Sequence, residues 1–255
     1  MLIKPKKRLG QHFLKNEEIA KKIVNSITSP NREVLEIGPG MGVLTKYLLQ
    51  DEQRTLSVVE LDEESVEYLH SHYPELSPRI ISCDFLALPL DELYKEPFII
   101  IGNFPYNISS QILFKLLENK DKAVQLIGMF QKEVAERVTA SPGNKSYGIL
   151  SVLLQAFFTV EYLFTVDENQ FNPPPKVKSA VIRLTRDFDK KLSSDVSFFK
   201  KVVKTAFNQR RKTLRNSLKA FTMSDNLKNS PILNLRPEQL TVAQFEWICN
   251  EILNH

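Results

Sequence analysis

Residues 33–44 read EVLEIGPGMGVL, and this stretch decides how the rest of the chain is interpreted. It begins with a short, largely apolar run of the kind that forms a buried strand. Glycines then occupy positions 38, 40 and 42, and the apolar residues after them recur at helical spacing. A strand, a glycine turn and a helix in this order let the backbone pass close to a ligand. We therefore predict a ligand-binding turn that includes Gly38 and Gly40, although Val43 stands where a dinucleotide signature would have its third glycine.

Further apolar runs bounded by polar loops predict a sheet covered on both faces. The predicted strands are 55–61 (TLSVVEL), 79–85 (RIISCDF), 98–104 (FIIIGNF) and 123–130 (AVQLIGMF), and the predicted helices are 63–71, 109–118 and 131–140. Strands that alternate with helices are typical of a mostly parallel α/β sheet with right-handed crossovers. Ligands of such sheets bind at the carboxyl ends of the strands.

The pattern changes beyond Phe157. Two strand-like runs, FFTVEYLFTV and SAVIRLT, flank the loop NPPPK and suggest an antiparallel edge pair. After about Asp187 the strand signal ends and only helical periodicity remains. We predict an α/β domain over residues 1–187, with a basic N-terminal segment, and a small all-helical domain over 188–255.

Composition describes an ordinary soluble protein, because 42% of the 255 residues are hydrophobic and 25% are charged. Cys83 and Cys249 lie far apart and have neither disulfide nor zinc-ligand spacing, so we expect a reducing, cytoplasmic location. No signal peptide and no run of about 18 apolar residues is present, which predicts no contact with a membrane.

Charge is unevenly distributed along the chain. Residues 31–130 contain 8 Lys and Arg against 16 Asp and Glu, whereas residues 198–219 contain eight basic residues and no acidic one. The first 22 residues add seven basic residues against two acidic ones. Basic ends around an acidic middle suit a polyanion held at the periphery. The alternative is that these charges form solvated helix faces.

Two acidic residues follow the next predicted strands. Glu60 ends the second strand, near the spacing of about 20 residues at which an acid receives the ribose hydroxyls of an adenosine ligand. Asp84 ends the third predicted strand, where its carboxylate could accept a hydrogen bond from another polar group of the same ligand. With the glycine turn, these residues predict a site for an adenosine-containing ligand.

The fourth predicted strand ends in GNFPYN, residues 102–107. The Asn103 side-chain oxygen and the Phe104 backbone carbonyl are two acceptors suited to the hydrogens of a flat amine such as that of adenine. Pro105 stiffens the turn, and Tyr106 offers a ring on which a base can stack. Such a site works by orientation and proximity, and it requires no general base.

In these stretches the chain resembles the ribosomal RNA adenine dimethyltransferases of the KsgA/RsmA type. The matching stretches are GQHFL, EIGPGMGVLT, VVELD, CDFL, GNFPYNIS, FQKEVAERV, SYGILSV, FNPPPKVKSAVIRL and AFNQRRKTLRNSL, and they run in order over almost the whole chain. The resemblance implies a Rossmann-like, S-adenosylmethionine-dependent methyltransferase domain with a C-terminal helical domain. It also implies that two adjacent adenosines in the 3'-terminal hairpin of 16S rRNA, within the small ribosomal subunit, are dimethylated.

The resemblance assigns roles residue by residue. The cofactor would be lined by His12, Leu14, Gly38, Gly40, Glu60, Asp84 and Asn103. The catalytic turn would be Asn103, Phe104, Pro105 and Tyr106, and Phe171 would stack on the flipped adenine. Arg210, Arg211, Lys212 and Arg215, expected within about one and a half turns of one helix, would contact RNA phosphates without reading bases. We expect S-adenosylmethionine as methyl donor, no metal, and a monomer.

Two alternatives remain at this point. The first is the 23S rRNA adenine methyltransferase of the macrolide-resistance type, which shares the catalytic turn. The second is a small-subunit assembly factor that has lost catalysis, although the intact turn from Asn103 to Tyr106 argues against such a loss. A mitochondrial transcription-type relative acting on DNA lacks support, because no transit peptide rich in Arg and Ser precedes the predicted domain. The sequence departs from the family pattern in having His12 where many members have Asn, and Phe104 where Leu is common. We expect both departures to be tolerated, because His12 can still hydrogen-bond and the role proposed at position 104 belongs to the backbone.

Overall fold

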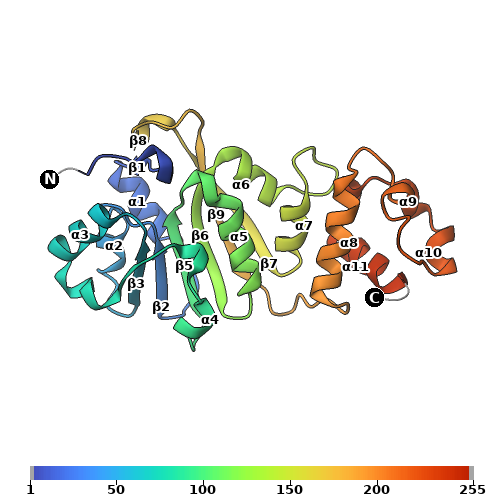
Figure 1. Cartoon of the computed structure of the whole chain (residues 1–255), viewed down its shortest axis with the longest axis horizontal. Helices are drawn as coiled ribbons and strands as arrows, with labels where there is room; N and C mark the ends of the chain where they lie inside the picture. Colours follow the sequence, from blue (N-terminus) through green and yellow to red (C-terminus); the bar gives the residue numbers. More distant parts are fainter. Residues whose placement is uncertain (1–2, 253–255) are drawn as a thin grey trace. The chain divides into compact units, whose positions relative to one another are not determined.

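The computed structural model describes residues 3–252 and divides into two compact units (Figure 1). Among the described residues, the first unit contains 3–135 and 161–186, and the second contains 136–160 and 187–252. No helix among the described residues is both long enough and apolar enough to cross a membrane.

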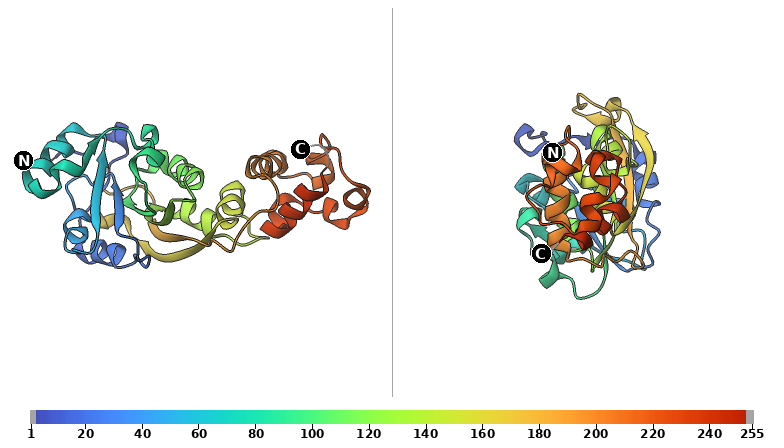
Figure 2. Two further views of the ribbon diagram at one scale, coloured as in Figure 1. Left: turned by 90° about the horizontal axis from the view of Figure 1, so that it is seen from below. Right: turned by 90° about the vertical axis from the view of Figure 1, so that its right-hand side faces the viewer.

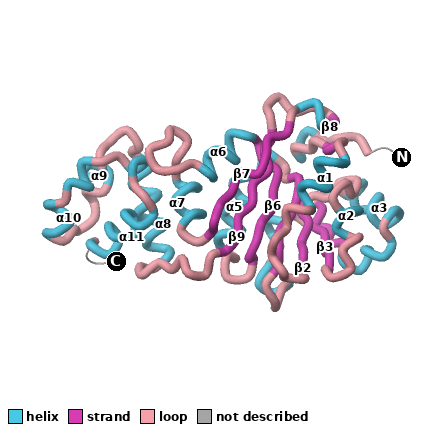
Figure 3. The backbone as a smooth tube through the Cα atoms, turned by 180° about the vertical axis from the view of Figure 1, so that it is seen from behind, coloured by secondary structure: helices cyan, strands magenta, loops and turns pink. Residues whose placement is uncertain are grey.

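The first unit is built on a seven-stranded sheet with the order β4-β3-β2-β5-β6-β9-β7. Figure 3 shows strands of this sheet side by side in magenta. These strands are β2 Glu33–Ile37, β3 Thr55–Glu60, β4 Ile80–Ser82, β5 Phe98–Asn103, β6 Ala123–Gln131, β7 Phe158–Val166 and β9 Ser179–Arg186. The five strands from β4 to β6 are parallel, and β9 runs antiparallel to β6. The predicted α/β fold is confirmed, and the two runs flanking the proline loop are neighbours at the sheet edge.

Helices of the first unit connect these strands and lie around the sheet (Figure 2). They are α1 Glu17–Val24, α2 Thr45–Leu48, α3 Glu63–His72, α4 Leu90–Leu93 and α5 Ser109–Glu118. The next helix, α6 Lys132–Thr139, begins in the first unit and ends in the second, because the division falls after Ala135. The chain runs from β2 through β3 to the edge strand β4 and then reverses, so that β5 lies on the other side of β2. Right-handed crossovers therefore put α2 and α3 on one face and α5 on the other. That reversal makes the carboxyl ends of β2 and β5 the switch point where open α/β sheets bind ligands.

A second, two-stranded sheet joins distant parts of the chain. β1 Phe13–Leu14 pairs antiparallel with β8 Phe171–Asn172, so that Leu14 lies opposite Phe171. Both side chains are buried in the same hydrophobic cluster as α1 and the central strands. The basic N-terminal segment is thereby attached to the loop with three prolines.

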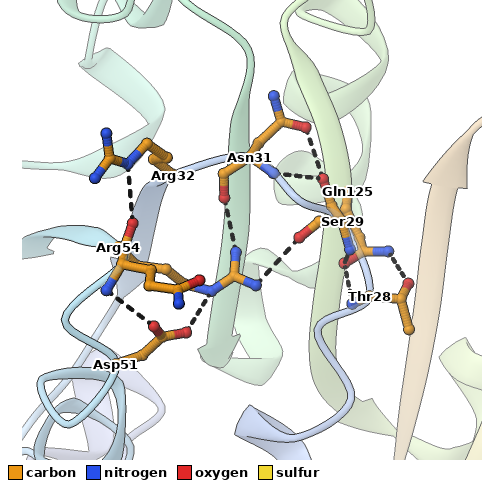
Figure 4. A network of polar contacts seen from close by, with 8 residues as sticks. Thr28, Ser29, Asn31, Arg32, Asp51, Arg54 and Gln125 are labelled. Carbon is orange, nitrogen blue, oxygen red and sulfur yellow. Dashed lines mark hydrogen bonds and ion pairs between the residues drawn. The ribbon is translucent and has the colours of Figure 1, made fainter.

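A polar network ties the loop before β2 to the sheet (Figure 4). Gln125 on β6 is fully buried, and its Oε1 accepts from the backbone N–H groups of Thr28 and Ser29 at 3.0 and 3.1 Å. Its Nε2 donates to the hydroxyls of Thr28 and Thr185 at 2.7 and 3.0 Å. The side-chain amide therefore has four partners, as a buried polar group requires. Arg54 reinforces the loop by donating to the carbonyls of Ser29 and Asn31 and to Asp51.

The second unit is a helical assembly with its own core. Its helices are α7 Ile149–Gln155, α8 Val196–Asn208, α9 Leu214–Ser217, α10 Asp225–Asn229 and α11 Val242–Glu251. Phe199, Val203 and Phe207 are buried along one face of α8 at helical spacing. The ring of Phe207 stacks on Phe245 of α11 with a centroid distance of 5.9 Å. The helical character predicted after Asp187 is therefore confirmed.

Residues 136–160 group with these helices, whereas the sequence analysis assigns them to the first domain. The reason lies in α7, where five of the seven residues are buried (Leu150, Ser151, Val152, Leu153 and Leu154). A helix this apolar must be covered by other elements, and α8 and α11 cover it. The domain boundary predicted after residue 187 therefore stays a prediction about which segments fold as one domain.

Candidate active site

A cavity of about 290 Å³ lies at the switch point of the first unit. Its wall is formed by the end of each of the four strands β2, β3, β4 and β5, together with residues 8–13 of the N-terminal segment. Six predicted site residues line it together: His12, Gly38, Gly40, Glu60, Asp84 and Asn103. Phe104, Pro105 and Tyr106 of the predicted catalytic turn line the same cavity. The parallel sheet has therefore gathered residues that are far apart in sequence, as expected at the carboxyl ends of its strands.

The glycine turn is held against the end of β3 by Glu60. The Glu60 Oε2 accepts from the Gly40 N–H at 3.1 Å, and its Oε1 accepts from the N–H groups of Leu61 and Asp62. Burial raises the pKa of Glu60, and these backbone hydrogen bonds act in the opposite direction. Gly40 has a φ of 55°, and a Cβ there would lie 2.7 Å from the Phe13 ring. Glycine is thus required here both by conformation and by space.

Asp84 forms the wall after β4. Its carboxylate caps the short helix η3 Phe85–Ala87 by accepting from the Leu86 N–H at 2.8 Å. Phe85 is 4% exposed and also lines the cavity. The exposed carboxylate of Asp84 can therefore hydrogen-bond a ligand, and the ring of Phe85 beside it provides an apolar contact.

Asn103 is oriented by the N-terminal segment. Its Nδ2 donates to the His12 backbone carbonyl at 2.8 Å, a bond that only the amide nitrogen can make. The Oδ1 is consequently the end of the amide that can accept hydrogen bonds from a ligand. This is the orientation that the predicted role of Asn103 requires.

The ring of Phe104 occupies a slot formed by two glycines. Gly102 on β5 lies directly opposite Gly128 on β6, and a Cβ at either position would come within 2.7 Å of the Phe104 ring. The ring is 1% exposed and packs at 4.9 Å, centroid to centroid, against Phe130. Packing of this side chain therefore determines where the backbone of the catalytic turn lies, including the Phe104 carbonyl.

Tyr106 is held by contacts at its face and at its hydroxyl. The His12 ring stacks on it with a centroid distance of 5.3 Å, and its hydroxyl bonds to the Ser179 hydroxyl. The His12 Nδ1 lies 2.8 Å from the carbonyl of Pro173 and must therefore donate to it. His12 thus links the N-terminal segment, the proline loop and the catalytic turn, which the sequence did not indicate.

Two predicted site residues lie outside the cavity wall. Leu14 and Phe171 are 4% and 1% exposed, and both belong to the hydrophobic cluster behind β1 and β8. Leu14 instead lines a smaller cavity of about 50 Å³, whose wall also includes Gly38 and Asn103. For a base to stack on Phe171, the β1–β8 pair would have to move, so this role stays a prediction.

The N-terminal segment is anchored by contacts that were not predicted from the sequence. The Lys6 ammonium pairs with Asp62 and lies 2.9 Å from Glu64, and the Gln11 Nε2 donates to Asp62 at 3.1 Å. Burial alone would raise the pKa of Asp62, but hydrogen bonds from Lys6, Gln11 and Ser65 outweigh it and leave the pKa lowered. The motif VVELD contained Asp62 as a possible signal, but nothing in the sequence indicated its partner.

Glu36 on β2 was also missed. It is 1% exposed and accepts from the Thr45 hydroxyl at 2.6 Å, and burial raises its pKa from 4.5 to about 8. The residue therefore carries its proton at neutral pH. The apolar run EVLEIG predicts a buried strand, but it does not reveal that its central acid is buried with a single side-chain partner.

We expect Glu36 to make the protein less stable as pH rises from about 5 to 8. The unfolded chain releases this proton near the ordinary pKa of 4.5 and the folded chain only near 8, so the folded state binds more protons over that interval. Glu36→Gln should therefore lose much less thermal stability than the wild type between these two pH values. Melting temperatures of both proteins at pH 5 and pH 8 test this, and parallel curves would contradict it.

The four predicted RNA-binding residues do not lie on one helix, so this expectation was wrong. α8 ends at Asn208, Arg210, Arg211 and Lys212 form a turn, and only Arg215 lies in α9. Three adjacent cations leave no apolar side chain to bury at this point, and Leu214 then starts a new helix. All four side chains are exposed.

No group of three or more His, Cys, Asp and Glu side chains among the described residues is arranged to hold a metal ion. The expectation that no metal takes part stays a prediction.

Comparison with known proteins agrees with this geometry. The family described as "Ribosomal RNA adenine dimethylase" matches residues 3–252. The chain is 57% identical over 254 residues to the ribosomal RNA small subunit methyltransferase A of Bacteroides thetaiotaomicron, covering 98% of this chain and 95% of that protein. It is 58% identical over 245 residues to the protein of the same name from Flavobacterium johnsoniae, covering 95% of this chain and 94% of that protein.

Solved structures show the same architecture. A dimethyladenosine transferase from Plasmodium falciparum superposes with a TM-score of 0.76 at 24% identity, covering 92% of this chain and 94% of the other. The 23S rRNA methyltransferase ErmE superposes with a TM-score of 0.71 at 25% identity, covering 93% of this chain and 99% of the other. The chain therefore belongs to the ribosomal RNA adenine dimethylase family of S-adenosylmethionine-dependent methyltransferases.

Proposed function

We propose that this protein dimethylates the exocyclic amines of two adjacent adenosines in the 3'-terminal hairpin of 16S rRNA within the small ribosomal subunit. The observation that carries the proposal is that the Asn103–Tyr106 turn lines the same cavity as Gly38, Glu60 and Asp84. A methyl donor and an amine acceptor would therefore meet at the end of β5. The identity to small-subunit methyltransferases, which exceeds 50% over almost the whole chain, supports the choice of rRNA.

In this proposal the cavity binds S-adenosylmethionine, which supplies an activated methyl group. The cavity suits such a ligand, since its glycine turn allows close approach and its polar residues come from the ends of successive strands. Glu60 would receive the ribose hydroxyls with the lone pairs that its backbone partners leave available. Asp84 and Phe85 would contact the adenine, and Gly38 and Gly40 would let the backbone approach the amino acid portion.

The catalytic turn would act by orienting the target amine. The Asn103 Oδ1 and the Phe104 carbonyl would each accept one amine hydrogen, which localises the nitrogen lone pair otherwise delocalised into the adenine ring. Tyr106 would stack on the base, with its ring held by His12 and Ser179. The proton would leave after methyl transfer, so rate enhancement would come from proximity and orientation rather than from a general base.

The test is transfer of labelled methyl groups from S-adenosylmethionine to undermethylated small subunits and, in parallel, to large-subunit rRNA. We expect dimethyladenosine in digests of the small-subunit RNA alone. Label in large-subunit rRNA would instead favour a 23S-type activity. Binding to the particle without any label would favour a non-catalytic assembly factor.

We further propose that the enzyme acts as a monomer in the cytoplasm. Cys83 and Cys249 are both unpaired in the structure, which suits a reducing compartment. Light scattering of the purified protein tests the monomer, since a dimeric mass would contradict it.

The basic turn of the second unit is the proposed contact with RNA phosphates. Replacing Arg211 and Lys212 with Gln should weaken binding to small-subunit RNA by roughly tenfold at low salt and reduce the slope of log Kd against log salt by about 1 to 2. Adding Arg210→Gln should extend the effect, although Arg210 also donates to the Lys145 carbonyl at 2.5 Å.

Filter binding over a range of salt concentrations measures these changes. Lys228→Gln is the matched control in the same unit, because Lys228 is already paired with Asp225 at 3.0 Å. An unchanged salt slope in the double variant would show that the turn does not contact RNA phosphates and is an ordinary solvated surface.

A further inference from the structure

Lys115 makes an unusual set of contacts for a lysine on a helix. It lies on α5, which begins directly after the catalytic turn and η4 Tyr106–Ile108. Its Nζ donates to two backbone carbonyls, those of Leu86 at 2.8 Å and Leu88 at 2.6 Å. The same ammonium lies 5.1 Å from the centroid of the Phe85 ring. One side chain of α5 thus contacts both the backbone and a side chain of the loop after β4.

That loop forms one end of the proposed cofactor cavity. Asp84 and Phe85 line the cavity, and Asp84 caps η3 by accepting from Leu86. Lys115 holds the opposite side of this short turn, where the carbonyls of Leu86 and Leu88 would otherwise lack partners within the turn. A single turn of this kind is not stable alone, so its geometry depends on such external bonds.

The surroundings of Lys115 support a fixed position. Burial lowers the pKa of its ammonium, while Glu118, Asp84 and Cys83 act in the opposite direction. A partly buried ammonium is favourable only where it is hydrogen-bonded, and the two carbonyls satisfy that condition. The Phe85 ring adds a cation–π contact.

We propose that Lys115 is a positioning residue that holds Asp84 and Phe85 in the conformation that binds the adenine of the cofactor. The inference rests on the proposed function, because it assigns the cavity to S-adenosylmethionine. Lys115 itself touches neither the cofactor nor the target base. Its loss should therefore weaken cofactor binding without changing the acceptor pair at Asn103 and Phe104.

The test variant is Lys115→Met, which keeps an unbranched apolar side chain out to Cε and removes the ammonium. We expect the Kd for S-adenosylhomocysteine, measured by titration calorimetry, to rise about tenfold, in line with the loss of charge-assisted hydrogen bonds. The KM for S-adenosylmethionine should rise in parallel. The kcat at saturating cofactor and the KM for RNA should stay within about twofold, because the loss affects cofactor binding equally in the ground and transition states.

Lys122→Met is the matched control. Lys122 also donates to two backbone carbonyls, those of Asp91 at 3.0 Å and Tyr94 at 3.1 Å, in a segment that does not line the cavity. It should reduce thermal stability about as much as Lys115→Met and leave the Kd within about twofold. Lys115→Arg, which retains donors and charge, should restore most of the affinity.

Coupling to the loop provides a second readout. If Lys115 acts through Asp84 and Phe85, the effects of Lys115→Met and Asp84→Ala on the Kd should be less than additive. Additive effects, or a Kd in Lys115→Met equal to that of Lys122→Met, would overturn the inference. Should Lys115→Met fail to fold, Lys115→Gln is held to the same criteria. A wild-type protein that binds no S-adenosylhomocysteine would overturn the proposed function together with this inference.

Discussion

Asn103→Ala is expected to lower the rate of methyl transfer at saturating substrates by about 10³-fold, comparable to the removal of one catalytic hydrogen-bonding group elsewhere. The variant loses the acceptor that would orient the target amine. It also loses the bond from Nδ2 to the His12 carbonyl, which holds the N-terminal segment at the cavity. RNA binding should be largely retained, since the predicted phosphate contacts lie in the second unit.

Single-turnover transfer of labelled methyl with excess enzyme measures this loss, and filter binding measures the affinity for RNA. Asn25→Ala is the control, because Asn25 ends α1 and makes its capping contacts through the backbone. It should retain nearly full activity. A rate in Asn103→Ala near that of the wild type would remove the proposed role of the amide.

The second large effect is expected from Gly128→Ala, at a position that does not itself line the cavity. A Cβ at Gly128 would lie 2.1 Å from the Phe104 ring and 2.7 Å from the Phe130 ring. The Phe104 ring is fully enclosed, so its backbone must shift, and with it the carbonyl proposed as the second acceptor. A displacement of about 1 Å in catalytic groups can cost about 10²-fold in rate, which is the loss we expect in kcat.

A compensating change makes this prediction specific. Phe104→Leu alone should keep activity within a few fold, because the proposed acceptor is a backbone atom, and it should recover at least about tenfold of the loss in Gly128→Ala. Gly148→Ala is the control, since the nearest atom to its Cβ would be 3.9 Å away. If Gly128→Ala does not lower kcat, or if the double variant does not recover it, then the packing of Phe104 between the two glycines does not determine the position of the catalytic turn.

Much of the fold was predictable because its signals are local. The helix predicted over 109–118 is observed as α5 Ser109–Glu118. The strands predicted over 98–104 and 123–130 are observed as β5 Phe98–Asn103 and β6 Ala123–Gln131. Continuous apolar runs between polar loops identify buried parallel strands without knowledge of their neighbours. α7 was missed because its apolar run has no polar face, and periodicity cannot then distinguish a helix from a strand.

The cavity was predictable to a similar degree, because parallel strands present their carboxyl ends at one edge. Gly38, Glu60, Asp84 and Asn103 each follow or end a strand, and all four line the cavity. Gly128 could have been noticed as a glycine inside a strand, which marks close approach by another group. Lys115 and Lys6 gave no signal, since their partners are backbone carbonyls and carboxylates far along the chain.

The sequence by itself determined the alternation of the central strands with helices, the residues at the strand ends, and the resemblance to the family to which the chain belongs. These features depend on the spacing of residues close together in the sequence and on motifs that can be recognised without knowledge of the fold. Only the tertiary structure decided that Phe171 is buried, that Glu36 is held as a neutral acid, and that the basic turn interrupts a helix. Burial and pairing depend on which segments pack together, and this packing is a property of the whole fold rather than of any local stretch.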